Sequence, residues 1–226
     1  MRDELTSNVE LTHEVLAARL AHARSSKPTP GRPRDRFPAT DRFLASTSRH
    51  VAAANAVLLP AVKRQGPEGR HLAHEFARQS RRLEQAMYQA KGKLYGSTYS
   101  IRMPWTAVWG EVHDELEAWF GLEESLVARI AEDPDVRRNL AQRLYVGETH
   151  APSRPHPYLP HRGLAGRVAR RVARGVDQFW DTAEGRMLPE PVHTATHSRE
   201  GRLARYLLAD PDVDMQVSEA DGAAPD

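Results

Sequence analysis

The segment WTAVWGEVHDELEAWFGLEESLVARI, residues 105–130, decides the fold class of this 226-residue chain. Its large apolar residues recur every three to four positions, which is the period of an α-helix with one buried face. The residues on that face are Trp105, Trp109, Val112, Leu116, Trp119, Phe120, Leu126, Val127 and Ile130. We therefore predict an amphipathic helix over residues 104–131 that packs against other helices.

Four other segments show the same helical period. They cover residues 5–23, 41–64, 68–94 and 164–184. Thr40 or Asp41 is predicted to cap the helix over residues 41–64. No segment shows the strict alternation of polar and apolar residues that is typical of a half-buried strand. Amphipathic helices joined by short turns predict an all-α protein built as an antiparallel bundle, to which residues 164–184 add a C-terminal helix.

Proline-rich stretches separate these elements. Residues 25–39 form a basic linker inside the predicted bundle, and residues 151–163 form a second connection. We interpret residues 1–186 as one helical domain. Residues 187–226 continue as a loop and carry only acidic charges from Tyr206 onward, a composition that predicts a disordered tail.

The composition narrows the chemistry that the chain can support. It has no cysteine, which excludes disulfides, thiolate metal ligands and cysteine nucleophiles. It has eleven histidines, so a metal site would have to use imidazole and carboxylate ligands. The sequence contains no phosphate-binding loop and no nucleophile-elbow serine, and we predict no catalytic residue.

The charge balance and the apolar runs bear on partners and location. Basic and acidic residues nearly cancel, at 32 and 30, so neither nucleic acid nor a membrane is the expected partner. Arginines gather within residues 162–174, which we interpret as a solvated helix face, with contact to an anionic surface or to nucleic acid as the alternative. The longest apolar run, residues 51–62, is too short to span a bilayer, and the first residues lack a secretory signal. We therefore expect a soluble cytoplasmic protein. The sequence does not identify a protein partner.

Glu123 is the acidic residue with the most unusual position. At 100° per residue it falls on the centre line of the apolar face of residues 104–131, between Trp119 and Val127. Burying a polar group without a partner costs about 2–7 kcal/mol, and an isolated charge costs more. Three interpretations stay open: Glu123 is a metal ligand, it forms a buried ion pair with an arginine, or it is protonated.

Two histidines lie near the apolar faces of other helices. His50 flanks the face of residues 41–64, and His13 lies beside the face of residues 5–23. A single histidine on an apolar face is more often a hydrogen-bonded core residue than a ligand. Two histidines and a carboxylate on facing helices are more informative, because metal sites in bundle cores are built in this way. His13, His50 and Glu123 are therefore the candidate metal ligands.

The remaining helical histidines are predicted to lie outside the core. His71 and His74 project away from the apolar face of their helix. His113 and Glu117 have a spacing that permits chelation, but both fall toward the exposed side, so a solvated pair is the interpretation we favour.

Three segments resemble a known family. RHVAAANAVLLPAVKR, residues 49–64, resembles the cation-binding motif of the hemerythrin-like (HHE) family, and WFGLEESLVARI, residues 119–130, looks like a second copy. LTHEVLAARL, residues 11–20, is similar to the opening helix of that family. The resemblance covers residues 5–132 and implies an up-down four-helix bundle, to which the fifth helix and the tail are additions. In that family the core holds a non-haem di-iron centre that binds dioxygen or senses oxygen and iron.

The resemblance assigns roles to particular residues. It implies that His13, His50 and Glu123 are ligands from the first, second and fourth helices. Ala54 and Trp119 stand where the family has a carboxylate and a histidine, and the third helix is expected to carry no histidine or acid on its inward face. The implied function is binding or sensing of iron, or of a small diatomic ligand, through a reduced non-haem metal site. The alternatives are a metal-free helical interaction protein and, by family analogy alone, an enzyme acting on peroxide or nitric oxide.

Overall fold

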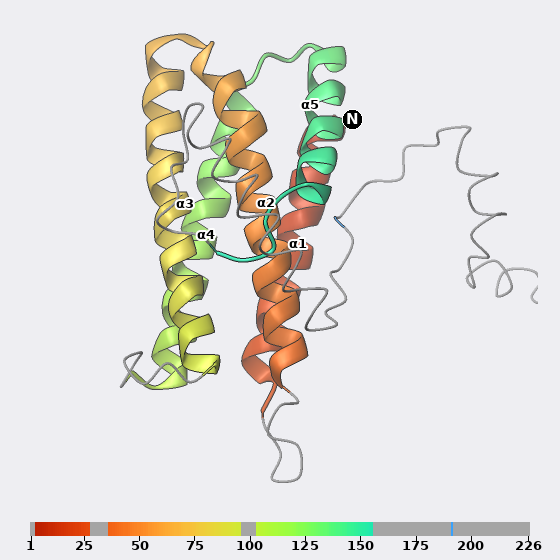
Figure 1. Ribbon diagram of the computed structural model, residues 1–226. Helices are drawn as coiled ribbons and strands as arrows, with labels where there is room; N and C mark the ends of the chain where they lie inside the picture. Colours follow the sequence, from red (N-terminus) through yellow and green to blue (C-terminus); the bar gives the residue numbers. More distant parts are fainter. Residues whose placement is uncertain (1–2, 28–35, 96–102, 156–190, 192–226) are drawn as a thin grey trace, which may run out of the picture. The chain divides into compact units, whose positions relative to one another are not determined.

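The computed structural model describes residues 3–27, 36–95, 103–155 and residue 191. Within these ranges the chain is helical and has no strand, which confirms the all-α prediction. The helices are α1 (Glu4–Ser25), α2 (Arg36–Lys63), α3 (Gly66–Leu94), α4 (Trp105–Arg129) and α5 (Pro134–Thr149) (Figure 1). None of these helices is long and apolar enough to cross a membrane.

The start of α2 differs from the sequence prediction. The helix begins at Arg36, inside the segment predicted as a linker, so the proposed caps Thr40 and Asp41 lie within the helix. Pro38 falls in the first turn, where a proline loses no intrahelical hydrogen bond. Asp41 instead accepts a hydrogen bond from the hydroxyl of Tyr95 at 2.7 Å. The prolines of residues 25–39 therefore led to the prediction of a linker where the first turn of α2 lies.

Helix α5 was missed by the sequence analysis, which predicted no element over its residues. The carboxylate of Asp133 caps it by accepting hydrogen bonds from the backbone N–H groups of Asp135 and Val136, at 2.9 and 3.3 Å. Pro134 follows in the first turn, a position that proline favours. The helix predicted over residues 164–184, the arginines of residues 162–174 and the acidic tail lie outside the described residues.

The helices pack around a core to which all five contribute. Helix α2 contacts each of the other four, α3 packs against α4, and α5 packs against α1 and α2 (Figure 1). The largest fully buried side chains are Leu5, Leu16, Phe43, His50, Leu58, Phe76, Leu83, Met87, Leu116, Trp119, Leu126 and Leu140. His50 is the one titratable side chain in that set, and it lies in the middle of α2. The core is mostly apolar, and the candidate ligands share it with a few other buried polar side chains such as Thr47, Asn55 and Ser80.

A buried arginine fastens the start of α5 to two other helices. The guanidinium of Arg137 donates hydrogen bonds to the carbonyls of Val127 and Ile130 at the end of α4, both at 3.1 Å. The same group forms an ion pair of 2.7 Å with Asp3 and donates to the hydroxyl of Thr6 at 2.9 Å. Carbonyls at a helix C-terminus lack intrahelical partners, so Arg137 satisfies the end of α4 while it anchors α5 to α1.

Candidate metal centre

The structure brings together the three residues that the sequence analysis selected as ligands. His13 comes from α1, His50 from α2 and Glu123 from α4. Each offers one ligand atom, and these atoms lie within 4.8 Å of one another. His13 is 7% exposed, and His50 and Glu123 are fully buried. The helical phase of each segment correctly placed the three side chains on buried faces, and the packing of α1, α2 and α4 brings them together.

Both imidazoles converge on one oxygen of Glu123. The Nε2 atom of His13 lies 2.8 Å from Oε2 of Glu123, and the Nε2 atom of His50 lies 3.0 Å from that same oxygen. The other oxygen, Oε1, is buried and has no hydrogen-bond partner among the residues that the structure describes. A buried carboxylate oxygen is normally hydrogen-bonded. Within the described part of the chain, the cluster therefore contains a hydrogen-bond acceptor that is not used.

A second carboxylate faces the opposite nitrogen of each imidazole. The Nδ1 atom of His50 lies 2.8 Å from Oε1 of Glu148, a buried residue near the end of α5. The Nδ1 atom of His13 lies 3.4 Å from Oε1 of Glu124, whose side chain is 61% exposed. Sequence reasoning missed Glu148 because it missed α5, although the Asp133-Pro134 start signal was available.

The charges of the cluster stabilise one another. Burial opposes the charged form of His50, but the charges of Glu123 and Glu148 and their hydrogen bonds outweigh it and raise its pKa to about 10. Burial likewise opposes the charged form of Glu123, but the charge of His50 and hydrogen bonds from both histidines lower the pKa of Glu123 to about 2. Among the described residues Glu123 is therefore paired with two histidines and with no arginine, and its lowered pKa favours the carboxylate form.

Aromatic side chains surround the cluster. The ring of His13 stacks on Phe120 with the centroids 3.9 Å apart. Trp119 contacts the edge of His50 at 5.4 Å between centroids, and its indole N–H donates to the hydroxyl of Ser80 at 3.0 Å. The position expected to hold a family histidine is therefore occupied by a packed tryptophan whose polar atom is already used. These rings also reduce the access of water to the cluster.

Two other positions bear on the ligand count. Ala54, where the resemblance expects a carboxylate, is fully buried and offers no ligand atom. The expectation that α3 carries no acid on its buried side was wrong, because Glu84 is only 5% exposed. Glu84 does not join the ligand cluster, which consists of His13, His50 and Glu123. The described part of the chain thus offers three ligands at this site.

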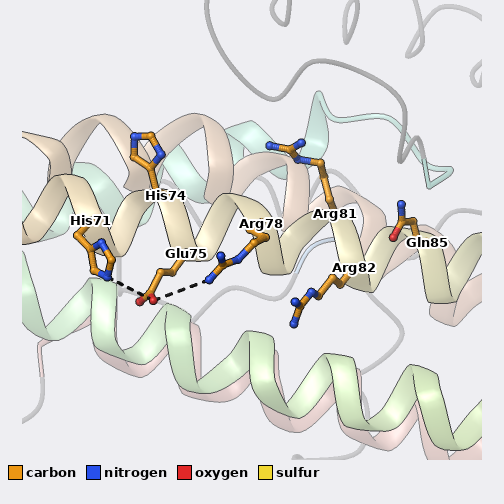
Figure 2. A pocket seen from close by; sticks show the side chains of 7 residues that line it. All are labelled: His71, His74, Glu75, Arg78, Arg81, Arg82 and Gln85. Carbon is orange, nitrogen blue, oxygen red and sulfur yellow. Dashed lines mark ion pairs between the residues drawn. The ribbon is translucent and has the colours of Figure 1, made fainter.

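The histidines of α3 lie on its exposed face, as predicted. Figure 2 shows a hollow along this face, where His71 and Arg78 both point toward Glu75. The His71–Glu75 pair is 3.4 Å long and the Arg78–Glu75 pair 3.9 Å, with the side chain of His71 78% exposed. On α4, His113 is exposed, as predicted. The surface hollow and the buried ligand cluster are therefore separate features of the molecule.

Comparisons of this chain with protein-family models, with curated proteins and with solved structures found no match. The resemblance to the hemerythrin-like family therefore rests on the quoted motifs, and the geometry of the cluster has to support a function by itself.

Proposed function

We propose that this chain is a metal-binding helical protein in which His13, His50 and Glu123 hold a single non-haem metal ion. The observation that carries the proposal is the orientation of the two imidazoles. Their Nε2 atoms meet at Glu123, and the Nδ1 atom of His50 faces the buried carboxylate of Glu148. Histidines that bind metals characteristically donate their other ring N–H to a carboxylate or carbonyl, which fixes the tautomer and the direction of the lone pair.

The donor atoms fit a metal ion in chemistry and in spacing. Two imidazole nitrogens and one carboxylate form the ligand set of mononuclear non-haem iron sites, and zinc uses the same set. The separations of 2.8 and 3.0 Å between Glu123 Oε2 and the histidine nitrogens suit ligands with bonds of about 2 Å to one ion. Oε1 of Glu123 has no partner among the described residues, which supports the same assignment, since a bound ion would use its lone pairs.

We propose iron as the metal. We also propose that α1–α4 form a hemerythrin-like, up-down four-helix bundle, to which α5 is added. Support comes from the ligand helices, because the resemblance assigns its ligands to the first, second and fourth helices and the cluster draws on α1, α2 and α4. Bound iron would supply an ion to which a small diatomic molecule can attach. The chain's own residues hold the ligands in place and exclude water, through Phe120 and Trp119. The proposed role is binding or sensing of iron or oxygen species.

A metal-free helical scaffold is the second candidate, and one observation favours it. His50 is held between the carboxylates of Glu123 and Glu148, at 3.0 and 2.8 Å, so the buried charges are already paired without an ion. Such a network is compatible with a stable core. In this alternative the polar cluster makes the packing of α1, α2, α4 and α5 specific, and it binds no ligand.

Metal analysis separates the two candidates. Protein purified without a histidine tag and reconstituted with Fe²⁺ under anaerobic conditions should retain one ion per chain after gel filtration, measured by plasma mass spectrometry. His50→Ala and Glu123→Ala should lose that ion. His71→Ala and His113→Ala, on the exposed faces of α3 and α4, are matched controls and should retain it. Wild-type protein that retains no ion, and whose melting temperature is unchanged by a chelator, would establish the scaffold instead.

A further inference from the structure

Glu148 and His50 form a buried pair at the boundary between α2 and α5. The Oε1 atom of Glu148 lies 2.8 Å from Nδ1 of His50, and Glu148 is 5% exposed. We infer that Glu148 is a positioning residue of the metal site: it holds the hydrogen of His50 on Nδ1, so that the lone pair of Nε2 faces the ion. This inference rests on the proposed function, and it gives α5 a role that the family resemblance, which ends before α5, does not include.

The tautomer argument follows from the two nitrogens of one ring. A neutral imidazole has one N–H donor and one lone pair, and a metal can use only the lone pair. An acceptor-only carboxylate at Nδ1 favours the hydrogen on that atom and leaves the lone pair on Nε2. Nε2 of His50 lies on the side of Glu123 and His13, where the ligand atoms converge. His50 is fully buried, so bulk solvent does not compete with Glu148 for its Nδ1 hydrogen in the intact protein.

The packing of α5 explains how Glu148 reaches this position. A Cβ atom added to Gly147 would lie 3.2 Å from Cβ of Ala53, which is tighter than an ordinary contact. Glycine therefore lets the last turn of α5 approach α2 one turn away from His50. The other end of α5 is fixed by Arg137 through its ion pair with Asp3. Anchoring at both ends keeps the Glu148 carboxylate aligned with the ring.

Within the described part of the chain, the other ligand histidine, His13, has no buried carboxylate at its Nδ1 atom. Glu124 lies 3.4 Å from Nδ1 of His13, which is longer than a good hydrogen bond, and its side chain is 61% exposed. Exposed pairs of this kind contribute little to stability. Glu124 is therefore the matched control for Glu148, because both are carboxylates opposite a ligand histidine and only one is buried.

The test compares the Zn²⁺ affinity of Glu148→Gln and Glu148→Ala with that of Glu124→Gln, by competition with a chromophoric chelator. Loss of an outer carboxylate lowers metal affinity by about 10–100-fold, so we expect Glu148→Ala to bind Zn²⁺ about 100-fold more weakly and Glu148→Gln about 10-fold. The smaller loss in Glu148→Gln follows because an amide oxygen still accepts from Nδ1. Glu124→Gln should stay within about fivefold of wild type.

Nitrogen NMR of the zinc form supplies a readout that loss of packing would not produce. Wild type should show His50 with a slowly exchanging hydrogen on Nδ1, and that signal should persist in Glu148→Gln and disappear in Glu148→Ala. Should Glu148→Ala fail to fold, Glu148→Gln against Glu124→Gln decides the question. Equal Zn²⁺ affinities of Glu148→Gln and Glu124→Gln would overturn the positioning role of Glu148 and leave the proposed metal site standing. Wild-type protein that binds neither Zn²⁺ nor Fe²⁺ would overturn the proposed function, and this inference with it.

Discussion

The Nε2 atom of His50 lies 3.0 Å from Oε2 of Glu123, and neither side chain has any exposed surface. Both charges of this pair are therefore removed from water, and each depends on the other for its ionised form. Removing one partner from a buried ion pair destabilises a protein more than removing an exposed charge, because the remaining charge is left uncompensated. This relationship has consequences for stability that are independent of whether a metal binds.

Glu123→Gln is expected to destabilise the metal-free protein by about 3–5 kcal/mol, since it removes the negative charge shared by His13 and His50. The measurement is urea unfolding at pH 7 in the presence of a chelator. Glu124→Gln, one position along at an exposed site, should change the free energy of unfolding by less than about 0.5 kcal/mol. An unchanged or increased stability of Glu123→Gln would mean that Glu123 is weakly paired.

The protonation of His50 should persist in the metal-free protein well above neutral pH. Its pKa is raised from 6.5 to about 10, so the folded state binds the proton more tightly than the unfolded state. The resulting stabilisation is fully present below about pH 6.5 and is lost as the pH rises through 10. Nitrogen NMR should show both ring nitrogens of His50 protonated at pH 8. A ring that is neutral at pH 8 would contradict the strong pairing with Glu123 and Glu148.

Asp3 should make the stability of the protein sensitive to acid. Burial raises the pKa of Asp3, but hydrogen bonds from Arg137 and Thr6 outweigh it and lower the pKa from 3.8 to about 2. The depressed pKa means that the stabilisation is present above about pH 3.8 and is lost as the pH falls through 2. Asp3→Ala also removes the N-cap of α1 and should cost about 1 kcal/mol at pH 7. Thermal melts at pH 7 and pH 2 should show that difference shrinking in acid.

Two helical glycines should respond in opposite directions to a larger side chain. Gly147→Val would force atoms against Ala53 and should destabilise the fold by about 1–3 kcal/mol. Gly121 of α4 is exposed, and an added Cβ would meet nothing within 4 Å. Gly121→Ala should therefore stabilise the protein by about 0.5–1 kcal/mol through helix propensity. Chemical denaturation measures both, and a neutral Gly147→Val would show that α5 does not pack closely on α2.

Periodicity was a sufficient guide to α1, α3 and α4 and to the candidate ligands, because each helix has a clear apolar face. Glu123 could be placed in the core from Leu116, Trp119 and Val127 alone. The same method did not detect α5, because the large apolar residues on its buried face are only Leu140 and Leu144.

What sequence reasoning could not supply was the partner of each buried charge. Whether Glu123 meets an arginine or two histidines depends on how α1, α2 and α4 are packed, and periodicity fixes only which face of each helix is buried. The contact of Glu148 with His50 could not be predicted for the same reason, since it exists only because α5 packs against α2. Pro38 misled the prediction of the α2 start, because a proline in a first turn and a proline in a linker look alike in sequence.

The buried contacts of the cluster join residues that are far apart along the chain. His50 is 73 residues from Glu123 and 98 from Glu148, and His13 is 110 residues from Glu123. Contacts between residues so far apart in sequence form late in folding. Closing the long loop between them costs chain entropy before the contact can stabilise the fold. During synthesis both histidines leave the ribosome long before either carboxylate does. The nascent chain therefore presents two imidazoles without their acids, and the site closes only after residue 148 has emerged.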